Sequence, residues 1–125
     1  MKFTYQELDN MQASINALLV QKMPIKITAR LKKLLKVLEP DISTLNTSKI
    51  ESVQKHGGIV DPSGRYSISA ENNKEGFDNF VKELNELHTL ETNDITFELI
   101  SLSEIPDISL TVLELQSLEK LFKDE

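Results

Sequence analysis

The sequence predicts a mostly helical α+β fold in one domain spanning residues 1–125. Three observations support this: apolar residues recur at helical spacing, strong turn chemistry separates two short apolar stretches, and a late segment alternates like a strand. We expect an N-terminal helical hairpin with a kinked second helix, a third helix near 72–88 and a short C-terminal helix. A small antiparallel sheet would combine a hairpin near 59–68 with a strand near 94–101.

The first helix is expected to begin after Thr4, because Thr4-Tyr5-Gln6-Glu7 has the form of a capping box. Apolar residues follow at helical spacing: Leu8, Met11, Ile15, Leu18 and Leu19. Pro24 should end this run, since proline disfavours the helical conformation in the residue before it and suits the first turn of a new helix. Two helices meeting at "KMP" therefore predict a helical hairpin.

The second helix contains the stretch "KITARLKKLLKVLEP" at residues 26–40. Its apolar residues share an arc of about 100°, the width of a core-facing stripe: Ile27, Leu31, Leu34, Leu35 and Leu38. Basic residues occupy the other side: Lys26, Arg30, Lys32, Lys33 and Lys36. Pro40 removes a helical hydrogen bond, so we expect a kink or break near Lys36–Pro40 and a second helical piece from about Asp41 to Gln54.

Gly57-Gly58 is expected to stop that piece, because glycine tolerates the left-handed conformation common at helix ends. Asp61-Pro62-Ser63-Gly64 then has strong turn chemistry, and the flanking apolar residues predict a short β-hairpin.

The third helix should place one apolar stripe on a single face: Phe77, Phe80, Val81, Leu84 and Leu87. In "NDITFELISL", Ile95, Phe97 and Leu99 would point to one side of a strand, which we expect to join the hairpin in a three-stranded sheet. The last helix follows the capping-box form Thr111-Val112-Leu113-Glu114.

Charge is distributed unevenly along the chain, whose formal net charge is −6. Residues 1–70 carry ten basic and six acidic residues, a net of +4, and residues 71–125 carry four and fourteen, a net of −10. The overall charge argues against non-specific nucleic-acid binding. With no cysteine, no membrane-length apolar stretch and no apolar region near the N-terminus, the chain is expected in the cytoplasm of some cell, not in a membrane.

The basic face around Lys26, Arg30, Lys33 and Lys36 has several interpretations. It could bind phosphates, but no aromatic residue lies between Tyr5 and Tyr66 for bases to stack on. It could lie on a membrane or in a partner's groove, but its apolar face has no Trp or Phe. We prefer the interpretation in which the leucines are core and the lysines are solvated.

Candidate catalytic, cofactor and metal sites are predicted to be absent. His56 and His88 each stand near a helix end, where we expect them to interact with the helix dipole. "GGIVDPSG" lacks the GK[ST] ending of a phosphate-binding loop, and the acidic residues lack the spacing of a calcium loop. Glu83 and Glu86 share a helix face and are expected to be solvated rather than catalytic.

The order of these parts resembles a family of unknown function encoded by tailed bacteriophages and prophages of Gram-positive bacteria. The resemblance rests on the first 39 residues with the junction "KMPIK", on "DPSGRYSIS" and "FDNFVKELNEL", and on "ITFELISLSEIPDISLTVLELQSLEKLF". The sequence departs from that pattern at Pro40, where such proteins tend to keep a charged residue, and at "DISTLNTS", which replaces a more acidic run. The resemblance implies a phage setting, with the protein in the host cytoplasm or on a virion, but no particular activity.

We therefore expect a non-enzymatic phage protein that acts through protein–protein interaction, either as a virion or assembly accessory factor or as an inhibitor of a host factor. Its expected partner is a phage structural protein or a host protein, with a second copy of the chain as a further candidate. The residues expected to form an interaction surface are Lys26, Arg30, Lys33, Lys36, Glu83, Glu86 and Glu91. The alternative is a small nucleic-acid-binding regulator that uses the basic face of residues 26–36.

Overall fold

A computed structural model describes residues 1–105 and 108–123 of the chain. It is mostly helical with one small antiparallel sheet, which confirms the predicted fold class. In chain order the elements are α1 (Tyr5–Leu19), α2 (Ile25–Lys55), β1 (Ile59–Val60), β2 (Tyr66–Ser67), α3 (Lys74–His88), the 3-10 turn η1 (Leu102–Glu104), α4 (Val112–Ser117) and the 3-10 turn η2 (Glu119–Leu121).

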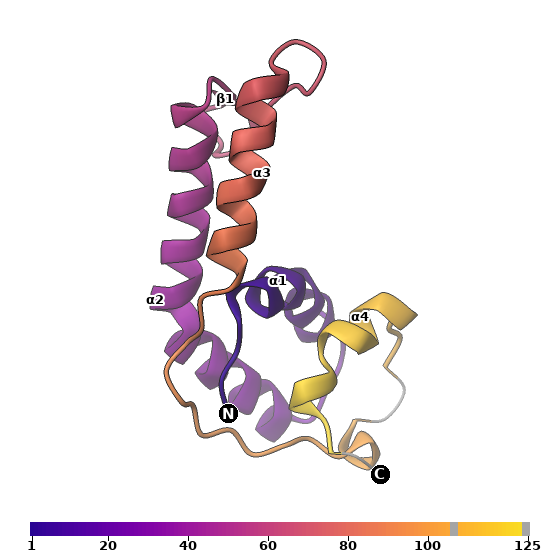
Figure 1. The fold of residues 1–125 in the computed structure, drawn as a ribbon. Coiled ribbons are helices and arrows are strands. Elements are labelled where there is room, and N and C mark those ends of the chain that lie inside the picture. Colours follow the sequence, from indigo (N-terminus) through magenta and orange to yellow (C-terminus); the bar gives the residue numbers. More distant parts are fainter. Residues whose placement is uncertain (106–107, 124–125) are drawn as a thin grey trace.

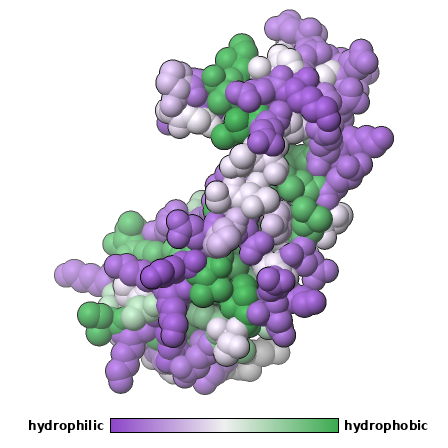
Figure 2. All heavy atoms as spheres, turned by 90° about the vertical axis from the view of Figure 1, so that its left-hand side faces the viewer, coloured by the Kyte–Doolittle hydropathy of each residue, from purple (hydrophilic) through white to green (hydrophobic). Residues whose placement is uncertain are grey.

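Two regions are visible in Figure 1. In the first, which we call the body (residues 1–45, 89–105 and 108–123), α1, the first part of α2 and α4 gather around one core. In the second, which we call the arm (residues 46–88), the rest of α2 and α3 run side by side away from the body, with the hairpin at the far end. Figure 2 shows the molecule narrowing between the arm's tip and the body.

The body core is made mainly by the two stripes that the sequence predicted. Thr4 and Glu7 form the expected capping box at the start of α1, with Glu7 N–H donating to Thr4 Oγ1 at 3.1 Å. The buried members of the two stripes are Leu8, Met11, Ile15, Leu18, Ile27, Leu31, Leu34 and Leu38. The leucines of the lysine-rich helix are therefore core residues, as predicted, and Leu35 is half-buried beside them.

Pro40 lies inside α2 and does not end it, so of the predicted kink or break the break does not occur. The axis of α2 does change direction part way along in Figure 1, as expected for a kinked helix. Two contacts support the turn that follows Pro40: Thr44 Oγ1 donates to the Pro40 carbonyl at 3.0 Å, and Tyr5 Oη donates to Asp41 at 2.8 Å. Burial of Tyr5 and its bond to Asp41 raise the pKa of its hydroxyl to about 12.

The predicted third strand does not join the hairpin, because the sheet has only β1 and β2 within the described residues. Residues 92–99 form no regular secondary structure and lie in the body. The first residues of the chain pair with residues 91–95: Thr4 bridges Glu91, and the Met1 carbonyl accepts from Ile95 N–H at 2.7 Å. Ile100 instead bridges Phe122. The predicted strand therefore pairs with segments near the two ends of the chain, and not with the hairpin as we had expected.

The arm has a small core of its own. Its buried apolar side chains are Val53 on α2 and Phe80 on α3, and the Tyr66 ring of the hairpin packs edge-on against Phe80 with centroids 6.1 Å apart. α3 starts two residues later than predicted, with Asn73 as its cap. Gly76 lets α3 approach the end of α2 closely, since a Cβ there would lie 2.2 Å from the His56 carbonyl oxygen.

The predicted turns also form. Gly57 follows α2 with a φ of +83°, in the left-handed region that favours glycine. The Asp61 carboxylate accepts from the backbone N–H groups of Ser63 and Arg65, both at 2.9 Å, which closes the hairpin turn.

Candidate interaction groove

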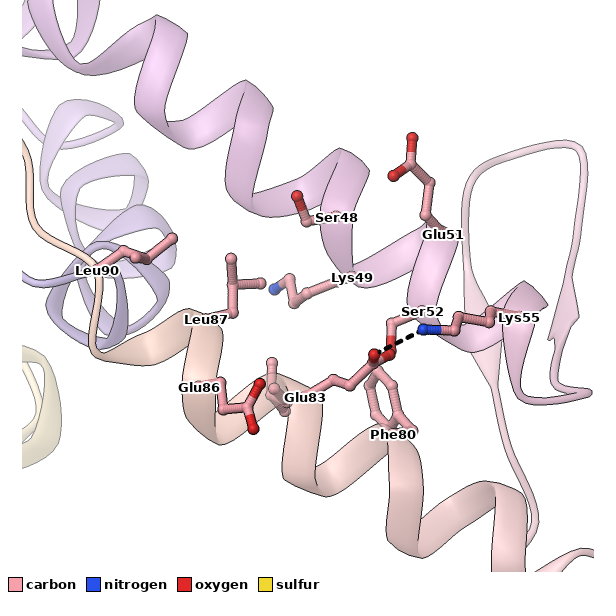
Figure 3. Close-up of a pocket in the computed structure, with 11 residues that line it drawn as sticks. Ser48, Lys49, Glu51, Ser52, Lys55, Phe80, Glu83, Glu86, Leu87 and Leu90 are labelled. Atoms are coloured by element: carbon pink, nitrogen blue, oxygen red, sulfur yellow. Dashed lines mark hydrogen bonds and ion pairs between the residues drawn. The ribbon is translucent and has the colours of Figure 1, made fainter.

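A groove runs along the arm between the second half of α2 and α3, and its volume is about 420 Å³. Figure 3 shows side chains from both helices lining it. On the α3 side the floor is apolar: Phe80, Leu84, Leu87 and Leu90. On the α2 side the wall is polar: Ser48, Lys49, Glu51, Ser52 and Lys55. Leu90 is 50% exposed, so part of the apolar floor is open to solvent.

Glu83 is the centre of the polar contacts between the two helices. Its carboxylate accepts from Ser52 Oγ at 2.7 Å and from Lys55 Nζ at 2.9 Å, and it lies 2.8 Å from His56 Nε2. Figure 3 shows the contacts with Ser52 and Lys55 crossing from α3 to α2. The bond from Ser52, followed by those from Lys55 and His56, lowers the pKa of Glu83 to about 2. Glu83 therefore links the two arm helices, while its side chain stays 36% exposed to solvent.

Asp9 has a similar role where the arm leaves the body. From α1 it accepts a hydrogen bond from Lys49 Nζ of α2 at 2.5 Å, and its other oxygen lies 2.8 Å from His88 Nε2 of α3. All three side chains are largely buried, at 21%, 13% and 19% exposure. Each histidine thus contacts a carboxylate on another helix, in addition to standing at a helix end as predicted.

The predicted basic residues are divided between different surfaces. Arg30 lies beside Glu98 and Glu104, at 3.4 and 3.3 Å, and is only 23% exposed. With Lys33 it lines a separate shallow groove against residues 95–98. Lys26 is exposed, and Lys36 lines another hollow, next to Glu39. Arg30 is thus held mainly by this chain's own carboxylates, whereas the three lysines face solvent.

The predicted acidic residues lie closer together. Glu83 and Glu86 both line the arm groove, and Glu91 is exposed three residues after α3 ends. Sequence reasoning missed Ser52, Lys55 and His56 as the counterparts of Glu83, and it missed the contacts of Asp9 with Lys49 and His88. The i, i+3, i+4 spacing of Ser52, Lys55 and His56 on one helix face was a visible signal, but nothing in the sequence identified the carboxylate 27 residues away.

The described residues of the groove form neither an activated nucleophile nor a cluster of metal ligands. Ser52 and His56 both bond to Glu83, so the histidine does not stand between an acid and a hydroxyl as a nucleophile's base must. Within residues 1–105 and 108–123, no three His, Asp or Glu side chains are grouped as metal ligands. The same described part contains no helix that is apolar enough, over a sufficient length, to span a bilayer.

The comparisons with known proteins provide no relative for this arrangement. No protein-family model matches the chain, and no curated protein or solved structure gives a significant match.

Proposed function

We propose that this chain is a non-enzymatic phage protein that works by binding another protein, and that the arm groove is its contact surface. The observation that carries the proposal is the apolar floor of the groove, which the described chain covers only in part: Phe80 is buried, Leu84 and Leu87 are half-buried, and Leu90 is 50% exposed. Withdrawing such a surface from water is the main driving force of protein association.

The position of the groove supports this role. The arm stands clear of the body in Figure 1, so a partner can approach both of its helices along the groove. The helices that form it are held in place by the Glu83 contacts, so the surface is formed before a partner arrives. A preformed surface loses less conformational entropy on binding than one that must be ordered.

Two versions of the proposal differ in the partner. As an accessory factor of virion assembly, the protein would bind a phage structural protein. As an inhibitor of a host factor, it would use the net charge of −10 in residues 71–125 to occupy a site that normally binds nucleic acid. Mass spectrometry of purified particles and of assembly intermediates separates them, because only the assembly version expects the protein there.

The groove itself is tested by recovering the tagged protein from phage-infected cells, with Leu90→Asp as the variant. Leu102→Asp is the matched control, because Leu102 is also 50% exposed but lies in the body. We expect one protein to co-purify stoichiometrically with the parent and with the control, and to be lost with Leu90→Asp, since a buried carboxylate in the contact is costly. Retention of that protein by Leu90→Asp would contradict the assignment of the groove.

A second candidate function is the small nucleic-acid-binding regulator. It is favoured by the exposure of Lys26, Lys33 and Lys36, which form no ion pair within the described residues. A gel-shift titration at low salt tests it, because binding through lysines weakens steeply as salt rises. The absence of a shift with DNA and RNA at micromolar protein would remove this candidate.

A further inference from the structure

We infer that the arm groove takes an amphipathic α-helix of a partner protein, with apolar residues on one face and Lys or Arg beside them. This inference rests on the proposed function, and it specifies the chemistry of the partner. It follows from the shape of the floor and from the charges that remain unpaired at the rim.

The shape of the floor fits a helix. The partly exposed apolar residues Leu84, Leu87 and Leu90 follow one another at intervals of three, and the buried Phe80 lies four residues before them. The accessible part of this stripe covers about two helical turns, and it is complementary to side chains at i, i+3 and i+4 of a second helix. Laid between α2 and α3, that helix would complete a layer of three packed helices.

An extended peptide fits less well. Both walls of the groove are α-helices, whose central backbone N–H and C=O groups are already bonded within each helix. A strand would find no backbone edge to pair with and would leave its own backbone groups unsatisfied in the contact. A helix brings its backbone bonds with it, so only side chains need partners in the groove.

The charge of the partner follows from the ion pairs already formed. Both lysines of the groove are neutralised within the chain, Lys49 by Asp9 and Lys55 by Glu83. Glu51 on α2 and Glu86 on α3 are exposed and form no ion pair within the described residues. Figure 3 shows them on opposite helices, with no dashed line joining either to a cation. The charge left free at the rim is therefore negative on both sides, which attracts a cationic helix and repels an acidic one.

The experiment measures binding of two synthetic amphipathic helices to the full chain by fluorescence anisotropy. The peptides share one leucine stripe and differ in their flanking residues, which are Lys in one and Glu in the other. The variant is Glu51→Lys with Glu86→Lys. The matched control is Glu71→Lys with Asp78→Lys, which makes the same change in net charge at exposed residues outside the groove. Circular dichroism confirms that each variant is folded.

We expect the parent and the control to bind the lysine peptide, and to lose affinity as salt rises. The groove variant should bind that peptide about three- to tenfold more weakly and should prefer the glutamate peptide, given the modest strength of rim ion pairs. Failure of the lysine peptide to bind, or an equal loss of affinity in the groove variant and the control, would overturn the inference.

One further variant separates this inference from the proposed function. If both peptides bind equally and Leu90→Asp abolishes both, the groove binds proteins but its charge does not select them, and only the inference fails. If Leu90→Asp binds the lysine peptide as the parent does, the groove is not the site, and the proposed function fails with the inference.

Discussion

The body and the arm are built from the same kind of amphipathic helix, and α2 even runs through both, yet the two regions bury very different amounts of apolar surface. In the body a continuous cluster includes residues from α1, α2, η2 and the C-terminal segments. In the arm, Val53 and Phe80 are the buried apolar side chains, and the rest of the α3 stripe is half-buried.

The reason for the difference is geometric. α1 packs on the first part of α2 and α4 packs on α1, whereas the second part of α2 has mainly α3 and the two-residue strands of the hairpin beside it. Two helices can hide only the seam between them, so polar contacts must align the arm. The lesson is that the same apolar stripe is core in one half of a helix and potential contact surface in the other, depending on what the remaining chain covers.

The largest effect should come from the body. Replacing Leu31, which is fully buried, by alanine should lower the free energy of unfolding by about 2–5 kcal/mol, because a cavity remains in a packed core. Urea denaturation followed by circular dichroism measures it. Val37→Ala on the same helix is the control, since Val37 is 51% exposed and should change the stability by less than about 0.5 kcal/mol. Similar losses in the two variants would show that the leucine stripe is not core.

The junction between the regions comes next. Asp9→Asn removes the charge that Lys49 and His88 share, and we expect a loss of about 1.5–3 kcal/mol, as for hydrogen bonds to charged groups. The melting temperature reports the effect. Asp78→Asn serves as control, because Asp78 is exposed and makes no ion pair within the described chain. Unchanged stability of Asp9→Asn would mean that the arm is anchored by packing alone.

Within the arm, shortening a buried apolar side chain should lower the free energy of unfolding by less than it does in the body. Val53→Ala removes two methyl groups from a fully buried site, so we expect a loss of about 1–2 kcal/mol. Limited proteolysis should show cleavage in the hairpin first, since Val53 packs beneath Gly58. A variant that unfolds the whole chain without prior cleavage of the hairpin would contradict the separation of arm and body.

The smallest effect should be a loss of stability at low pH, caused by protonation of Glu83. The pKa of Glu83 is about 2 in the folded chain and near 4.5 when unfolded, so its stabilising contribution is complete above about pH 4.5 and is lost as the pH falls towards 2. Carboxyl NMR shifts give the folded pKa directly. In Glu83→Gln this pH-dependent contribution should vanish, and a normal Glu83 titration near 4.5 would refute the contacts with Ser52 and Lys55.

The helices and the body core could be predicted from the sequence because their signals are local. The capping boxes at Thr4 and Thr111 form as expected, and the stripe positions Leu31 and Leu38 are buried. We expected Pro40 to kink or break the helix, and the helix continues across it. Helix propensity could not anticipate the hydrogen bond from Tyr5 to Asp41, which stabilises the turn after Pro40.

The errors arose where the partner of a segment lies far away in the sequence. Residues 92–99 have a strand pattern, but residues 91–95 pair with residues 1–4 and not with the hairpin, which alternation alone could not reveal in so short a segment. The candidate site was found only in part for the same reason: Glu83 was selected, whereas its counterparts on α2 lie 27 to 31 residues away in sequence.

Amide hydrogen exchange on the intact chain, resolved by residue, tests the difference between body and arm most directly. We expect amides of α1 and of residues 27–38 to exchange only through global unfolding, and amides of α3 to open locally and exchange at least about tenfold faster. Addition of the lysine-flanked helix should slow the exchange of α3 selectively. Equal protection in α1 and α3 in the free protein would contradict the view that the arm is incompletely packed and awaits a partner.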